Sequence, residues 1–155
     1  MPRHSEARHL PYRPDQLFDL VADVARYPEF LPWITAARVR EDDGAAMTAD
    51  LVIGFAGFRE TYTSRVEKRR PDRIRVTAID GPLKTLRNDW GFVPDGEGCR
   101  LDFLVEFSFR SRILEALAAR VFPKAVGRMA AAFEARAYAL YRAGGISSSS
   151  AQNAA

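Results

Sequence analysis

The sequence predicts an α+β domain in which a curved antiparallel sheet wraps around one long C-terminal helix. Three patterns support this fold class: a helical apolar period over residues 111–142, an alternating period over 34–109, and a shorter helix signal after a first strand. The 155 residues, 47% of them hydrophobic, suffice for one compact domain with a sizeable core. We expect a single domain over residues 1–143 and a disordered, serine-rich tail over residues 144–155.

The N-terminal part predicts a strand and a helix. Residues 5–12 are expected to form the strand, and Pro14 begins the helix, because the missing amide of proline costs nothing in a first turn. The helix should end near Tyr27, since Pro28 disfavours helical geometry in the residue before it. Residues 27–33 contain two prolines and three aromatic residues, which predicts one helical turn and a kinked connection packed against an apolar surface.

Six strands are predicted between residues 34 and 109, because the apolar period becomes two and turn residues recur. The expected turns lie at residues 42–44, 56–57, 69–72, 80–82 and 95–98. This spacing is typical of an antiparallel meander. Alternate residues of segments 47–55 and 99–109 are apolar and define the inner face of the sheet.

The C-terminal helix carries one apolar stripe and one basic face. The stripe comprises Ile113, Leu114, Leu117, Val121, Phe122, Val126, Met129, Phe133, Ala137 and Leu140. Pro123 should bend the helix into a short and a long arm. We expect Arg120, Lys124 and Arg128 on the opposite face, clear of the stripe and of any pocket beneath it.

Polar residues share the inward strand faces with apolar ones: Glu60, Tyr62, Ser64 and Asn88. Burying such groups without partners costs several kcal/mol, so they satisfy one another, face water or bind a ligand. A one-residue slip at a bulge near Gly54 or Gly57 would instead turn Glu60 outward. The interpretation of a ligand cavity and that of mutual satisfaction are both open at this point.

Catalytic chemistry finds little support in the sequence. The two histidines, His4 and His9, lie near the N-terminus, and Cys99 shares the apolar face of its strand, as a structural thiol would. No metal-ligand spacing or phosphate-binding loop is evident. We expect no enzyme activity, no metal and no cofactor. The first residues lack the pattern of a secretory signal, which favours a cytoplasmic location, or a peripheral one on the inner membrane.

Four segments in order resemble the coenzyme Q-binding branch of the START-like, polyketide cyclase and lipid transport superfamily. They are residues 12–33, 50–66, 81–92 and 103–122, and the resemblance covers residues 5–142. Leu83 and Gly91 depart from the expected pattern, where an aromatic and a basic residue are usual. The resemblance implies a helix-grip fold whose C-terminal helix closes a hydrophobic tunnel for a polyprenyl quinone. The same branch includes bacterial ribosome association toxins, reported to block the joining of ribosomal subunits.

Two function classes follow. The first is a carrier or chaperone that binds ubiquinone or a similar polyprenyl lipid and supports respiration. Its expected ligand-binding residues are Leu51, Ile53, Phe55, Glu60, Tyr62, Asn88, Trp90, Phe103, Val126, Met129 and Phe133.

The second class is a ribosome association toxin of a toxin–antitoxin system, which binds the large ribosomal subunit. Its contact surfaces would be the basic face of Arg120, Lys124 and Arg128 and the basic stretch 64–75. An anionic membrane surface is an equally good partner for this charge. No DNA binding is expected, and an RNA-reading surface with interleaved aromatic residues is not evident.

Overall fold

The computed structural model describes residues 3–55 and 57–143, which form a seven-stranded sheet and its helices. The predicted tail, residues 144–155, lies outside the described residues. The elements in chain order are β1 (Arg3–Leu10), α1 (Pro14–Ala22), the 3₁₀-helix η1 (Val24–Glu29), β2 (Ile34–Asp42), β3 (Ala46–Phe55), β4 (Phe58–Arg69), β5 (Arg73–Asp80), β6 (Leu83–Asp95), β7 (Gly98–Phe109), α2 (Arg112–Ala137) and the π-helix η2 (Tyr138–Ala143).

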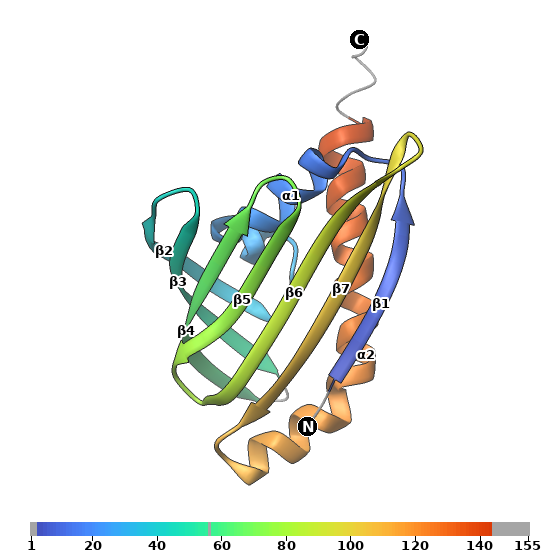
Figure 1. Ribbon diagram of the computed structural model, residues 1–155. Coiled ribbons are helices and arrows are strands. Elements are labelled where there is room, and N and C mark those ends of the chain that lie inside the picture. Colours follow the sequence, from blue (N-terminus) through green and yellow to red (C-terminus); the bar gives the residue numbers. More distant parts are fainter. Residues whose placement is uncertain (1–2, 56, 144–155) are drawn as a thin grey trace.

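The sheet is antiparallel throughout, with the strand order β1-β7-β6-β5-β4-β3-β2. It curves around the long α2, and α1 lies near the C-terminal end of that helix (Figure 1). The predicted α+β helix-grip fold is confirmed, as is the six-stranded meander over residues 34–109. The first strand begins at Arg3 and ends at Leu10, two residues earlier than predicted, because Pro11 has no amide to continue the ladder with β7.

The first helix is shorter than predicted. It ends at Ala22 rather than near Tyr27, because Asp23 leaves helical geometry with φ −83° and ψ 65°. The chain then tightens into η1, whose first turn is closed by the amide of Arg26 donating to the carbonyl of Asp23 at 3.1 Å. Pro28 therefore sits inside a 3₁₀-helix rather than after an α-helix.

The long helix α2 continues through Pro123, and its direction changes between a short arm, 112–122, and a long arm, 124–137 (Figure 1). The hydroxyl of Ser111 caps the short arm by accepting from the amide of Leu114 at 3.2 Å. The predicted apolar stripe is buried in its middle but exposed at its ends, where Ile113 is 73% and Leu140 is 45% accessible.

Two apolar clusters lie between sheet and helices. The larger one joins α1, the strands and the long arm of α2. In the smaller one, Leu114 and Ala118 of the short arm pack with Leu83 and Phe109 at one end of the sheet. The bend at Pro123 thus lets one helix cover two separate parts of a curved surface.

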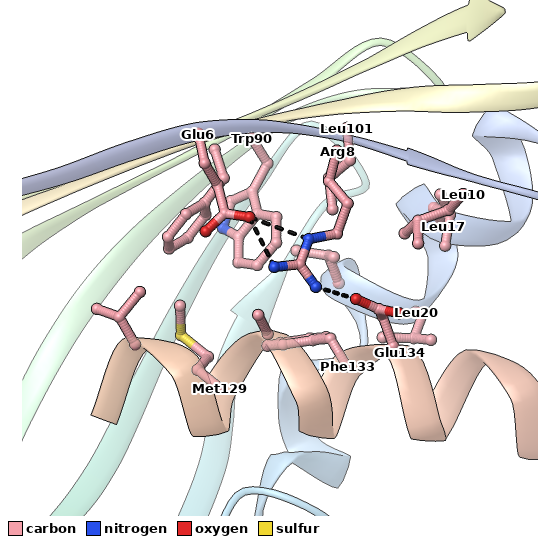
Figure 2. Close-up of a pocket in the computed structure, with 14 residues that line it drawn as sticks. Glu6, Arg8, Leu10, Leu17, Leu20, Trp90, Leu101, Met129, Phe133 and Glu134 are labelled. Atoms are coloured by element: carbon pink, nitrogen blue, oxygen red, sulfur yellow. Dashed lines mark hydrogen bonds and ion pairs between the residues drawn. The ribbon is translucent and has the colours of Figure 1, made fainter. Parts of the chain in front are cut away.

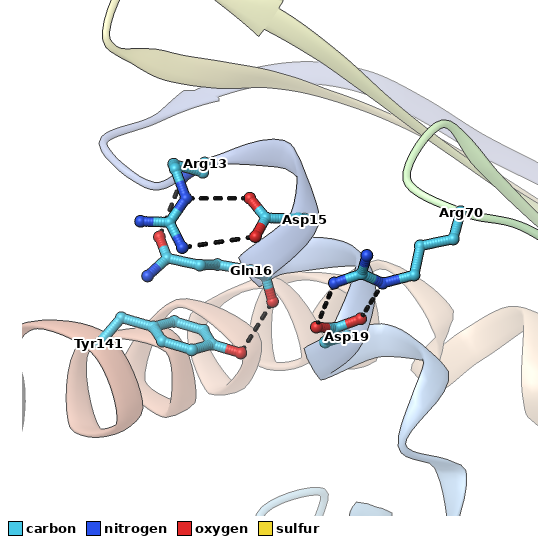
Figure 3. A network of polar contacts seen from close by, with 6 residues as sticks. All are labelled: Arg13, Asp15, Gln16, Asp19, Arg70 and Tyr141. Carbon is cyan, nitrogen blue, oxygen red and sulfur yellow. Dashed lines mark hydrogen bonds and ion pairs between the residues drawn. The ribbon is translucent and has the colours of Figure 1, made fainter.

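Polar contacts attach the helices to the sheet at several points. Figure 3 shows the hydroxyl of Tyr141 donating to the carbonyl of Gln16 at 2.8 Å, which joins η2, the π-helix after α2, to α1. In the same view the guanidinium of Arg70 makes a bidentate pair with Asp19, at 2.8 and 2.9 Å, which joins α1 to the turn after β4. The Arg70–Asp19 pair is exposed and contributes about 1 kcal/mol or less, whereas the Tyr141 contact is partly buried.

The register of β3 against β4 is continuous from Ala46 opposite Glu67 to Phe55 opposite Phe58. The register slip considered near Gly54 or Gly57 does not occur in this pair. Glu60 lies opposite Ile53, so it belongs to the inward face as the strand period predicts.

Candidate functional site: an apolar cavity under the helix

A cavity of about 540 Å³ lies between the inner face of the sheet and α2. Strands β3 to β7, the segment from η1 to β2, and both arms of α2 contribute to its wall. Eight of the eleven residues predicted to bind a ligand line it: Leu51, Ile53, Tyr62, Asn88, Trp90, Val126, Met129 and Phe133. Most of the predicted ligand-binding residues therefore lie on this wall, although contact with a ligand stays a prediction.

Of the other three predicted residues, Glu60 and Phe103 lie outside the cavity wall. Glu60 shares the inward face of β4 but lies near the start of that strand, beyond the cavity wall. Phe103 is buried behind Trp90, with ring centroids 4.6 Å apart, and faces a small pocket of about 40 Å³ between β1 and α2. The side chain of Phe55 lies outside the described residues.

Three charged side chains, Glu6, Arg8 and Glu134, line the small pocket and pair with one another. Figure 2 shows Met129 and Phe133 projecting from α2 toward Trp90, with Arg8 of β1 placed between Glu6 and Glu134. Arg8 pairs with both carboxylates, and the latter contact ties β1 to the long arm. Hydrogen bonds from His4 and Arg8 hold the pKa of Glu6 below its ordinary value. The Arg8–Glu134 pair thus joins β1 to α2 across the small pocket.

Phe133 is the centre of the aromatic packing at the base of the cavity. Its ring lies 5.8 Å from Tyr27, 5.2 Å from Phe30 and 5.1 Å from Trp90, centroid to centroid. These tilted and edge-to-face arrangements are the favourable ones for aromatic rings. Phe133 therefore links η1, the sheet and α2 while presenting part of its surface to the cavity.

The polar groups of the wall are largely satisfied by one another. The Asn88 amide donates to the carbonyl of Leu104 at 2.9 Å and accepts from the Trp90 indole at 2.9 Å. The hydroxyl of Ser64 donates to the carbonyl of Ala49 at 3.3 Å. For these residues the structure supports the mutual-satisfaction alternative.

Tyr62 differs, because its hydroxyl makes no hydrogen bond with any residue in the described ranges 3–55 and 57–143. Burial raises the pKa of Tyr62 to about 12. Burial, and then the neighbouring Tyr62, also raise the pKa of Tyr27, whose hydroxyl donates to the carbonyl of Val21. Tyr62 thus supplies a neutral hydrogen-bonding group to an otherwise apolar wall.

The basic face of α2 is not separate from the cavity, contrary to the prediction. Lys124 and Arg128 are exposed to solvent and also line the cavity, so they lie at its opening. Arg120 is exposed and is not part of the lining. Residues that a straight helical wheel places outside the apolar stripe therefore reach the opening of the cavity.

The second predicted basic surface is largely neutralised. Four of its cations pair with carboxylates: Arg65 with Glu67, Lys68 with Asp42, Arg70 with Asp19 and Arg75 with Asp89. Hydrogen bonds from Lys68 and from the amide of Gly44 hold the pKa of Asp42 below its ordinary value. The positive charge of stretch 64–75 is therefore weaker as a docking surface than its net sequence charge indicates.

Several lining residues were not among the predicted ligand contacts. Tyr27, Leu31 and Trp33 enter from η1 and the connection after it, and Val121 and Phe122 from the short arm. The density of aromatic residues and prolines over 27–33 predicted an apolar contact for that segment without locating a cavity. The placement of the two segments depends on the helix bend and the sheet curvature, which a local pattern does not encode.

The histidines and the cysteine occupy structural positions. His4 contacts Glu6 at 2.6 Å, and His9 contacts Asp95 at 3.1 Å. Cys99 is fully buried, and burial raises the pKa of its thiol, which disfavours the reactive thiolate. In the described part of the chain, no three histidine, cysteine or acidic side chains gather as metal ligands would.

A separate observation concerns membranes: none of the helices within residues 3–55 and 57–143 is long and apolar enough to cross a bilayer.

Known proteins resemble this chain in both sequence and structure. A ribosome association toxin of Rickettsia prowazekii is 41% identical over 132 residues, which cover 83% of this chain and 90% of the relative. A mitochondrial coenzyme Q-binding protein homologue of Xenopus laevis is 34% identical over 143 residues, covering 89% of this chain and 59% of the relative. Both relatives are named for binding or toxin roles.

A solved structure carries the same architecture at appreciable sequence identity. An 18 kDa protein from Caulobacter crescentus superposes with a TM-score of 0.73 at 43% identity, covering 91% of this chain and 99% of the other. Residues 10–134 match the family described as polyketide cyclase / dehydrase and lipid transport. With the curved sheet, the long helix and the cavity between them, these matches show that the chain belongs to the polyketide cyclase / dehydrase and lipid transport family.

Proposed function

We propose that the protein binds a hydrophobic ligand in the cavity between sheet and α2, and that this ligand is ubiquinone or a related polyprenyl quinone. The observation that carries the proposal is the cavity itself, at about 540 Å³ and lined mainly by apolar and aromatic side chains. Small-molecule sites usually occupy roughly 300–1,000 Å³ with few polar groups, as here. The coenzyme Q-binding name of one relative supports the choice of a quinone.

The wall offers a quinone both parts of a binding site. The isoprenoid chain packs on Leu51, Ile53 and Met129, and the hydroxyl of Tyr62 donates to a ring carbonyl. No bond is made or broken in this role, so the protein acts as a carrier or chaperone rather than as an enzyme. Such a carrier would support respiration by moving a lipid that water does not dissolve.

Organic extraction of the purified protein followed by mass spectrometry tests the proposal directly. Added quinone should also quench tryptophan fluorescence, because Trp33 and Trp90 both line the cavity. Single Trp33→Phe and Trp90→Phe variants assign the quenching to each residue. A protein that carries no lipid after purification and shows no quenching on addition of quinone would contradict the proposal.

Ribosome association is the second candidate, and one observation favours it beyond the name of the relatives. Arg120, Lys124 and Arg128 are exposed along one helix, and none of them forms an ion pair with a residue in the part of the chain described. Unpaired cations of this kind suit RNA phosphates.

Sedimentation with isolated large ribosomal subunits separates the two candidates. Arg120 does not line the cavity, so Arg120→Glu should weaken pelleting with the subunits while quinone quenching is unchanged. Raising the salt concentration should weaken pelleting in the same way. Pelleting that is insensitive to both changes would argue against docking through this face.

A further inference from the structure

The opening of the cavity carries charge of one sign. Among the described residues that line the cavity, Lys124 and Arg128 are the charged ones, and both are basic. They lie four positions apart on α2, which places them side by side on the helix surface. A neutral quinone makes no use of two cations, so the proposed ligand leaves this feature unexplained.

The two cations are not neutralised by the acidic residues of their own helix. Glu115 accepts a hydrogen bond from the amide of Phe109 at 2.9 Å, and Glu134 pairs with Arg8 of β1. Neither Lys124 nor Arg128 forms an ion pair with any other residue in the described ranges. Like charges four residues apart destabilise a helix slightly, so this arrangement is unfavourable without a counter-charge.

The surroundings strengthen the attraction for an anion. A cleft with apolar walls and charge of one sign at its opening concentrates the electric field there. Arginine presents paired donors that match a carboxylate or a phosphate, and lysine adds a compact positive charge. Met129 and Val126 continue the wall inward from the two cations, so a head group bound at the rim leads directly to an apolar tail site.

We propose that Lys124 and Arg128 form an anion subsite at the cavity opening, and that the cavity accepts amphiphiles with an apolar tail and a carboxylate or phosphate head. The inference rests on the proposed function, because the tail occupies the same cavity. It adds a ligand class that the neutral quinone does not represent.

The test compares ligands that share a tail and differ in charge. Palmitate and hexadecyl phosphate should bind more tightly than methyl palmitate, measured by displacement of a neutral fluorescent probe from the cavity. Lys124→Gln/Arg128→Gln should weaken palmitate binding by about tenfold or more, since hydrogen bonds to charged groups contribute roughly 1.5–3 kcal/mol. Binding of the methyl ester should not change in this variant.

Arg112→Gln/Arg120→Gln provides the matched control, because it likewise removes two positive charges from the same helix, at exposed positions outside the lining. It should leave all affinities unchanged. Equal binding of palmitate and its ester by the wild-type protein would overturn the anion subsite while leaving the hydrophobic cavity function intact. Failure of every tailed ligand to displace the probe would overturn both.

A final comparison separates the head group from the tail. Inorganic phosphate alone should compete only weakly with palmitate for the protein, because phosphate lacks the apolar tail that the cavity holds. If it competes as well as hexadecyl phosphate, the cations bind free anions independently of the cavity and the proposal is wrong.

Discussion

Tyr62 combines a partly buried ring with a hydroxyl that makes no hydrogen bond to the described residues, and its ionisation links stability to pH. A tyrosine in the unfolded chain loses its proton near pH 10, whereas the pKa of folded Tyr62 is raised to about 12. Between these values the unfolded state binds fewer protons than the folded one. The free energy of unfolding should therefore be unaffected below pH 10 and should fall above it, by at most about 1.4 kcal/mol per pH unit for each tyrosine.

Urea unfolding between pH 9 and pH 11.5 measures this dependence, and Tyr62→Phe is the matched variant. The variant should lose less stability over the window, with the remainder coming from Tyr27, Tyr141 and Cys99, whose pKa values are raised in the same direction. Identical pH profiles for the two proteins would show that Tyr62 is accessible to water in its folded state.

Asn88 supports the cavity wall through two hydrogen bonds, one to the Leu104 carbonyl and one from the Trp90 indole. Asn88→Ala leaves both partners unsatisfied in a mostly apolar setting, which costs about 1–3 kcal/mol. Chemical denaturation should show this loss. Lys84→Ala, at an exposed position of the same strand, should change stability by about 0.5 kcal/mol or less. A near-neutral Asn88→Ala would indicate that water replaces the lost contacts.

At the scale of secondary-structure elements, the stability of the short arm of α2 depends on its N-cap residue, Ser111. Ser111→Ala removes the side-chain cap on the amide of Leu114 and should reduce stability by about 1 kcal/mol. Ser111→Asp should restore the lost stability, because aspartate caps helices and interacts favourably with the helix dipole. Thermal unfolding of the three proteins checks the order. A Ser111→Asp variant as unstable as Ser111→Ala would assign the loss to something other than capping.

Elements with a clear period were predictable from sequence, and their boundaries were less so. The alternation of β3 and β7 correctly identified inward residues such as Leu51 and Phe103, because a sheet face follows the strand period. The end of α1 was predicted wrongly, since Pro28 was expected to stop an α-helix that Asp23 had already ended. The conformational preference imposed by Pro28 indicated the region in which the helix ends, but it did not identify Asp23 as the residue at which helical geometry stops.

The residues at the cavity opening could not be predicted from the sequence pattern. A helical wheel places Lys124 and Arg128 on a solvent-exposed face, because it assumes a straight helix over a flat surface. The bend at Pro123 and the curved sheet bring that face to the rim instead. Phe103, by contrast, was predicted to line the cavity but is covered by Trp90. Such differences arise from tertiary packing between elements far apart in the chain.

For the whole molecule, a bound ligand should stabilise the fold by mass action. A ligand that binds the native state alone adds about 2.7 kcal/mol at one hundred times its dissociation constant. Phe133→Ala and Phe18→Ala should each reduce stability by about 3–5 kcal/mol, since both rings are buried. Phe133→Ala should also reduce the stabilisation by ligand, because Phe133 lines the cavity, whereas Phe18 packs against Phe92 outside the lining. Equal ligand-induced shifts in melting temperature for both variants would place the ligand elsewhere.

The pairing of β1 with β7 has a consequence for how the chain folds during synthesis. Arg3 lies opposite Glu106, so the first strand of the sheet, β1, must wait for the last, β7, before it gains a neighbour. Strands β2 to β7 pair with strands next to them in sequence and can form successive hairpins while translation continues. Pairing β1 with β7 closes the long stretch of chain between them, which carries an entropy cost and slows folding. Docking of the N-terminal strand is therefore expected to be a late step, and until then the edge of β7 is open to pairing with other chains.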